Sequence, residues 1–173
     1  MNLIISGTNR PNSYSEKVAN YYLRRLTEDG DAWRLLSLNE LPESFVFSDM
    51  YGKRSSAFQG IQEMVSEAKK IVFVIPEYNG SFPGILKAFV DALSFPHSFH
   101  HKKAALIGLS SGKYGNIRGI DHFTGVCNYL RMHVLPLKIH IPNILTEIDE
   151  DGTIKEGTAR QFMDEQIQEI KEF

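Results

Sequence analysis

The segment SGTNRPNSYS, residues 6–15 and here called the first loop, carries side chains suited to holding an anion. It offers the hydroxyls of Thr8, Ser13 and Ser15 and the Arg10 guanidinium just before a helical pattern. Phosphate groups are bound by this combination of helix N-terminal N–H groups, short hydroxyls and an Arg fork. Neither a Walker motif nor GxGxxG is present. Two interpretations stay open, namely a phosphate site or an ordinary turn in which Ser13 or Asn12 caps the helix.

A second loop, residues 76–84, lies between a strand pattern and a helix pattern. Ile71–Ile75 is continuously apolar and mostly β-branched, which is typical of a strand covered on both faces. The loop PEYNGSFPG then holds two glycines, an Asn, a Ser and two prolines. Gly80 is the position where we expect a positive φ or close backbone approach to a ligand. Such a loop can lie flat against a planar ligand.

The third loop, Ser110–Gly119, follows another strand pattern. Its glycines, Gly112, Gly115 and Gly119, permit close backbone approach, and Ser110 and Ser111 offer hydrogen-bond donors. Its cations, Lys113 and Arg118, could bind an anionic ligand or could be solvated surface charges.

Two other features favour structural interpretations. Cys127 lies in a helical pattern, where a buried inert thiol is favoured over a nucleophile. His97, His100 and His101 cluster without a Cys or carboxylate in the sequence around them, so we favour a polar loop over a zinc site and expect no metal.

Strand and helix patterns alternate along the whole chain. Strands are predicted at 3–6, 33–38, 71–75, 104–109 and, weakly and interrupted by Pro136, at 133–137. Helices are predicted at 14–28, 55–69, 83–93, 118–132 and 159–170. For the helix at 118–132 we predict an inward stripe of His122, Val126, Tyr129 and Leu130. Residues 41–54 show no period and form an excursion with Phe45, Phe47, Met50 and Tyr51.

This alternation predicts a three-layer α/β sandwich around a parallel sheet. A five-stranded, doubly wound sheet of order 2-1-3-4-5 brings the first and second loops together at the switch point, where such sheets bind ligands. We expect residues 1–173 to form a single domain.

Composition excludes several classes of partner. The net charge of −2 and the pI of about 6.3 give no electrostatic basis for binding nucleic acid or an anionic membrane. No apolar run approaches the roughly 20 residues of a membrane span. The start MNLIISG lacks a signal-peptide pattern, and one cysteine fits a reducing compartment, so we expect a cytoplasmic protein.

Two of these segments carry a family resemblance. GTNRPNSYS resembles the G-[ST]-x-R-x-x-S-x-[NS] phosphate loop of the NADPH-dependent FMN reductase family, a flavodoxin-like group. PEYNGSFPGILKAFVD is similar to that family's P-E-Y-N-x-S-x-P-G-x-L-K-N-x-x-D signature. The resemblance runs from Leu3 to about His133. Ala88 stands where the family commonly has Asn, and Thr8 where Ser is commoner.

The resemblance implies a set of ligand-binding residues. The FMN phosphate would be held by Thr8, Arg10, Ser13, Tyr14 and Ser15. The isoalloxazine would be contacted by Pro76, Glu77, Tyr78, Asn79, Gly80 and Ser81. Ser110, Ser111 and Gly112 would lie at the flavin edge, and candidates for contacting NADPH or NADH are Lys113, Gly115, Asn116 and Arg118. Glu77 suggests a general base, but a structural role is favoured because flavin chemistry needs no protein base.

The function implied is an FMN-dependent NAD(P)H oxidoreductase. Hydride would pass in a ping-pong cycle through FMN to a small acceptor, which could be a quinone, an azo compound, chromate or free flavin. The alternatives are a flavodoxin-type electron carrier, which the small net charge disfavours, and a non-catalytic FMN-binding protein.

The aromatic residues predict a homodimer or homotetramer. Phe89, Val90 and Leu93 are followed by Phe95 and Phe99, which is more apolar surface than one helix needs for its own sheet. Residues 95–101 or 45–51 would then border the neighbouring subunit's flavin. The other interpretation is that these aromatics fill the core of one subunit.

Overall fold

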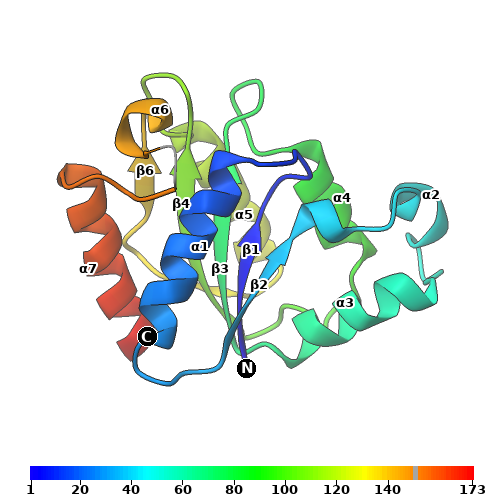
Figure 1. Ribbon diagram of the computed structural model, residues 1–173. Helices are drawn as coiled ribbons and strands as arrows, with labels where there is room; N and C mark the ends of the chain where they lie inside the picture. Colours follow the sequence, from blue (N-terminus) through cyan, green and yellow to red (C-terminus); the bar gives the residue numbers. More distant parts are fainter. Residues whose placement is uncertain (150–151) are drawn as a thin grey trace.

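The apolar runs of the sequence form parallel strands in the computed structural model, which describes residues 1–149 and 152–173. The strands are β1 (Asn2–Ser6), β2 (Trp33–Ser37), β3 (Lys70–Pro76), β4 (Lys103–Leu109) and β5 (His133–Val134). Their order in the sheet is β2-β1-β3-β4-β5, with every pair parallel, which confirms the predicted topology. Their carboxyl ends therefore meet along one edge, which is uppermost in Figure 1.

The fifth position of this sheet is divided between two short strands. β5 pairs with the start of β4, and β6 (Ile139–Ile141) pairs with its end. The single strand predicted at 133–137 is therefore too long, and β6 and the short helix α6 (Ile144–Glu147) were not predicted. Prolines at 136 and 142 obscure the strand pattern, because the first lies between the two short strands and the second directly follows β6.

Alternate residues of the central strands supply two separate cores. In β3, Ile71, Phe73 and Ile75 face the helices α3 (Ser56–Glu67), α4 (Gly84–Ala92) and α5 (Ile117–Tyr129). Val72 and Val74 face α1 (Tyr14–Thr27) and α7 (Thr158–Glu172) on the opposite side. The predicted three-layer sandwich is confirmed, and Figure 1 shows α1 and α7 in front of the sheet.

The predicted inward stripe of α5 is right for Val126 and Leu130, which are partly buried against the core, and wrong for its other two residues. Tyr129 is 80% exposed and His122 is also exposed, whereas the buried residues are Gly119, Ile120, Phe123 and Cys127. The rotation of the helix is fixed at Gly119, where an added Cβ would lie 2.0 Å from Asn116 Oδ1 and 2.8 Å from the carbonyl carbon of Ser81. Only a glycine allows α5 to pack this closely against the second loop.

The predicted excursion at 41–54 contains the short helix α2 (Phe45–Ser48), and a 3₁₀ helix (Leu38–Glu40) precedes it. Its aromatic residues divide between core and surface. Phe45 and Met50 are buried, whereas Phe47 and Tyr51 are each 91% exposed.

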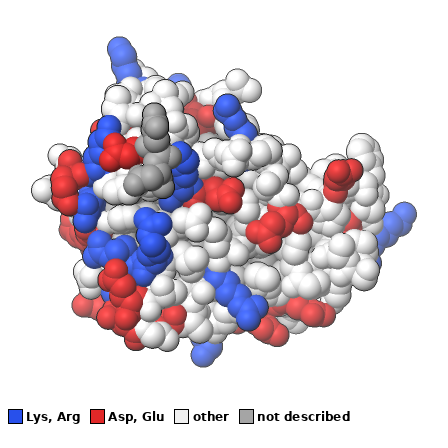
Figure 2. All heavy atoms as spheres, viewed as in Figure 1, with Lys and Arg blue, Asp and Glu red and all other residues white. Residues whose placement is uncertain are grey.

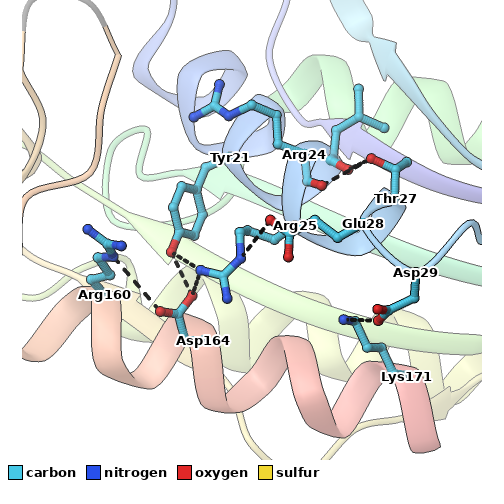
Figure 3. Close-up of polar contacts among 10 residues, drawn as sticks. Tyr21, Arg24, Arg25, Thr27, Glu28, Asp29, Arg160, Asp164 and Lys171 are labelled. Atoms are coloured by element: carbon cyan, nitrogen blue, oxygen red, sulfur yellow. Dashed lines mark hydrogen bonds and ion pairs between the residues drawn. The ribbon is translucent and has the colours of Figure 1, made fainter.

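Helix α7 is held to α1 by a partly buried polar network (Figure 3). Asp164 accepts hydrogen bonds from the Tyr21 hydroxyl at 2.6 Å and from Arg25 at 2.7 Å. Burial is the largest cause that raises the pKa of the Tyr21 hydroxyl, and the hydrogen bond to Asp164 raises it further. The phenol is therefore protonated at neutral pH and can donate this hydrogen bond. Figure 2 shows acidic and basic side chains interspersed over α1 and α7 without a patch of a single sign.

Candidate functional site

A cleft of about 530 Å³ opens at the carboxyl ends of β1, β3 and β4. The first loop, the start of the second loop and the start of the third loop line it, as the predicted switch point requires. The residues lining it are Thr8, Arg10, Pro11, Asn12, Ser13, Tyr14, Ser15, Pro76, Glu77, Tyr78, Leu109, Ser110, Ser111, Ile144 and Leu145.

The first loop turns sharply from β1 into α1. The N–H of Gly7 donates to Val74 O at 2.8 Å, which ties the loop to β3. Asn12 adopts a left-handed conformation with φ 53°, and the Ser13 hydroxyl then caps α1 by accepting from the Glu16 N–H at 3.2 Å. The first turn of a 14-residue helix therefore lines the cleft and brings its positive end to it.

Ser15 shows that this end of the cleft suits a phosphate. Its side chain is 1% exposed, yet its Oγ has no hydrogen-bond partner within the described part of the chain. Buried hydroxyls are nearly always hydrogen-bonded, and an unpaired one is unfavourable. Because Ser15 lines the cleft at the helix N-terminus, a phosphate oxygen is a fitting partner for it.

The second loop is a tight two-residue turn. Tyr78 and Ser81 exchange backbone hydrogen bonds of 2.9 and 3.1 Å, and the central residues Asn79 and Gly80 have φ of 51° and 78°. Two positive φ values define a type I′ turn, for which Asn-Gly is the preferred sequence. The positive φ predicted for Gly80 is confirmed. The turn is held further by the Glu77 N–H, which donates to Leu109 O at 2.8 Å.

A side-chain hydrogen bond joins the first two loops. The hydroxyls of Thr8 and Tyr78 lie 2.8 Å apart, and Thr8 Oγ1 also accepts from the Arg10 N–H at 3.3 Å. Thr8 is 1% exposed, whereas the Tyr78 ring is 37% exposed beside the cleft.

The third loop folds back on itself. The Ser110 hydroxyl donates to Gly112 O and accepts from the Gly115 N–H, both at 3.0 Å. Asn116 is fully buried in a left-handed conformation, and its Nδ2 donates to Ile75 O at 3.0 Å. Gly115 is also buried, against the backbone of His140 and Ile141. Gly115 and Asn116 therefore shape the loop from inside.

The structure gathers most of the predicted residues around the cleft. Ten of the fourteen predicted flavin-binding residues line it, and Asn79, Gly80, Gly112 and Lys113 line an adjoining hollow of about 290 Å³ that also includes Glu77 and Ser110. Arg118 lies beside Gly80, with Nη2 3.6 Å from where a Cβ would be. Ser81 lines neither, since its hydroxyl pairs with His122 Nδ1 at 3.0 Å.

Five lining residues were missing from the predicted set. Pro11, Asn12 and Leu109 adjoin predicted residues, whereas Ile144 and Leu145 come from α6. Ile144 and Leu145 follow Pro142 and Asn143 in the sequence. They could have been predicted to line the cleft only if β6 had first been recognised as a strand.

The remaining candidate groups lie apart from this chemistry. Cys127 is buried, and burial raises the pKa of its thiol to about 12, which makes it unreactive. Across residues 1–149 and 152–173, no three His, Cys, Asp or Glu side chains are grouped so as to hold a metal ion. No helix within those ranges is both long and apolar enough to cross a membrane.

A doubly wound parallel sheet of this order, with a cleft at its switch point, defines the flavodoxin-like class of fold. Residues 2–145 match the model of the NADPH-dependent FMN reductase family. The chain belongs to this family, whose cofactors are FMN and NAD(P)H.

Similar proteins cover nearly the whole chain. The NAD(P)H-dependent FMN reductase PA1204 of Pseudomonas aeruginosa is 28% identical over 96% of this chain and 91% of its own length. The 2-hydroxy-1,4-benzoquinone reductase of a Burkholderia species is 26% identical over 92% and 88%. The solved structure of the flavoenzyme NAD(P)H:(acceptor) oxidoreductase from Paracoccus denitrificans has a TM-score of 0.75 at 18% identity, covering 97% of this chain and 92% of that one, and supports the fold.

Proposed function

We propose that this protein binds FMN in the cleft at the switch point and uses NAD(P)H to reduce small quinones. The observation that carries the proposal is the buried Ser15 hydroxyl, which lines the cleft at the start of α1 without a partner among the described residues. The similarity to a benzoquinone reductase supports the choice of quinones as the first acceptors to test.

The first loop would hold the phosphate through the N-terminus of α1, the Ser15 hydroxyl and the Arg10 guanidinium. Thr8, Ser13 and Tyr14 would complete this end of the site. FMN, when bound, takes two electrons from a reduced nicotinamide and passes them to the acceptor. The chain's own task is to hold the ring, shield one side of it and leave the other open.

The second and third loops would contact the ring through backbone groups and short side chains. Pro76, Glu77 and Tyr78 line the cleft directly, and so do Ser110 and Ser111 of the third loop. Asn79, Gly80 and Gly112 lie at the adjoining hollow, at the edge of the ring site. Ser81 would act indirectly by fixing the turn through His122.

The reduced nicotinamide nucleotide, NADPH or NADH, would be bound at the hollow of about 290 Å³ that adjoins the cleft. Lys113 and Arg118 are both exposed there and could meet its phosphates. Gly115 and Asn116 are buried, so their contribution would be to set the shape of the third loop.

Glu77 would not serve as a general base. Its backbone N–H fixes the second loop to Leu109 O, and electron transfer through flavin needs no protein base at this position.

A spectrum of the purified holoprotein tests the function. Flavin absorbance bands should be present, and adding NADPH or NADH anaerobically should bleach them. Initial rates with benzoquinone, varied against the nicotinamide, should give the parallel reciprocal plots of a ping-pong enzyme. A flavin that NAD(P)H does not bleach would favour the electron carrier, and bleaching without quinone turnover would favour another acceptor class.

The active unit would be a homodimer or homotetramer of single-domain, cytoplasmic subunits. Phe47 and Tyr51 are 91% exposed and Phe95 is 65% exposed, which is unusual for large apolar side chains. They lie in the two segments, 45–51 and 95–101, proposed to border a neighbour's flavin, although Phe45 and Phe99 belong to the core. Sedimentation at micromolar concentration tests this, since a fully active 19.7 kDa species would contradict it.

A further inference from the structure

Among the residues that the structure describes, the Thr8–Tyr78 hydrogen bond is the one side-chain hydrogen bond between the two loops that would hold opposite ends of the flavin. Thr8 belongs to the loop around the phosphate end, and Tyr78 begins the type I′ turn beside the ring. Their oxygens are 2.8 Å apart, and Thr8 is almost completely buried. The position of the turn is thereby tied to the phosphate end of the cleft.

The direction of this bond depends on what else Thr8 binds. A hydroxyl has one O–H to donate and two lone pairs that accept. One lone pair of Thr8 accepts from the Arg10 N–H. With the phosphate end empty, either Thr8 or Tyr78 can be the donor between the two hydroxyls.

A phosphate would remove this ambiguity. A phosphate dianion only accepts hydrogen bonds, so the single O–H of Thr8 would be directed to it. The second lone pair of Thr8 is then free to accept from Tyr78. The three groups form a chain in which Tyr78 donates to Thr8 and Thr8 donates to the phosphate, and such chains strengthen each bond they contain.

We propose that Tyr78 is a positioning residue that couples occupancy of the phosphate end to the placement of the second loop against the ring. This inference rests on the proposed function, since it assumes FMN in the cleft. It predicts that the phosphate raises affinity for the ring even when the two are separate molecules. Riboflavin, which has the ring without the phosphate, and inorganic phosphate are the probes.

Binding is measured by quenching of flavin fluorescence on titration with apoprotein. For the wild type, saturating inorganic phosphate should tighten riboflavin binding about 3- to 10-fold, as expected for one hydrogen bond of ordinary strength. In Tyr78→Phe this effect should disappear, and FMN affinity should fall by about the same factor while riboflavin affinity without phosphate changes less than about 2-fold.

Matched variants separate coupling from general damage. Thr8→Ser keeps the hydroxyl and should retain the response of riboflavin binding to phosphate, whereas Thr8→Val should lose it. Adding Tyr78→Phe to Thr8→Val should cause no further loss, because the chain is already broken. Tyr129→Phe, on an exposed tyrosine of α5, should bind both flavins as the wild type does.

Two results would overturn the inference. One is an unchanged ratio of FMN to riboflavin affinity in Tyr78→Phe, whether both affinities stay the same or both fall together. The other is a wild-type riboflavin affinity that does not respond to inorganic phosphate. If the wild type failed to bind FMN at all, the proposed function itself would fail, so the two failures can be distinguished.

Discussion

Helix α1 has buried polar side chains toward both of its ends. Those toward the carboxyl end are hydrogen-bonded within the protein, whereas one at the amino end is not. Near the carboxyl end, Tyr21 and Arg25 bond to Asp164 (Figure 3). The Tyr22 hydroxyl donates to Gln166 Oε1 at 2.8 Å. Near the amino end, Ser15 Oγ has no partner among the described residues. The difference separates polar groups that stabilise the fold from one for which we propose a ligand as the partner.

The paired end is completed by Gln166, which is fully buried. Its Nε2 donates to Leu106 O and Leu137 O, at 3.2 and 2.8 Å, so that one amide joins α7, α1 and the sheet. Both polar atoms of the Gln166 side chain form hydrogen bonds inside the protein. The Ser15 hydroxyl, on α1, has no such partner among the described residues.

The largest expected effect comes from breaking the paired end. Gln166→Leu leaves the Tyr22 hydroxyl and two carbonyl groups without this partner, and we expect a loss of about 2–4 kcal/mol in the free energy of unfolding. Urea denaturation measures it. FMN affinity, measured where the variant is folded, should stay within about 2-fold of the wild type. A variant as stable as the wild type would show that this network contributes little.

Arg10→Ala tests the ligand end next. Losing a charge-assisted contact should weaken FMN binding by about 1.5–3 kcal/mol, without lowering the stability of the apoprotein, because the side chain is exposed. Fluorescence titration and apoprotein melting measure the two quantities. Undiminished flavin retention would remove Arg10 from the phosphate site.

Ser15→Ala should move affinity and stability in opposite directions. FMN affinity should fall by about 1.5 kcal/mol, while the apoprotein should be as stable as the wild type or up to about 1 kcal/mol more stable, since an unpaired buried hydroxyl is removed. Ser13→Ala is the matched control, because it removes a helix cap and should destabilise the apoprotein by about 1 kcal/mol. Equal destabilisation by both substitutions would mean that Ser15 has a structural partner.

Glu77→Gln should have the smallest effect. The substitution keeps the backbone bond to Leu109 O, so kcat should fall only a few-fold, far short of the ~100-fold expected on losing a general base. Steady-state rates at several pH values measure it. A fall of that larger size with FMN still bound would assign Glu77 a chemical role.

Local signals made much of this arrangement predictable from sequence. The continuous apolar run of β3 and the Asn-Gly pair that follows it specify a buried strand and a type I′ turn from neighbouring residues alone. The first loop was predictable for the same reason. The orphan state of Ser15 was not, because it depends on what packs around the residue.

The errors come from contacts between segments distant in the sequence. The apolar residues of α5 allow more than one inward stripe, and the choice is made by Gly119 packing against Asn116 and Ser81. Strand β6 is only three residues long and is flanked by Pro136 and Pro142, which obscure its pattern in the sequence. Because β6 was missed, the cleft wall formed by Ile144 and Leu145 was missed with it.

The burial of Cys127 has a practical consequence for labelling. It is the only cysteine in the chain, and its high pKa keeps it protonated at the pH of maleimide coupling. A substitution such as Tyr129→Cys on α5, outside the proposed subunit contact, would therefore give the protein one reactive thiol. Spin labels or fluorophores attached there would report the distance between copies of the protein in solution without prior removal of a native thiol.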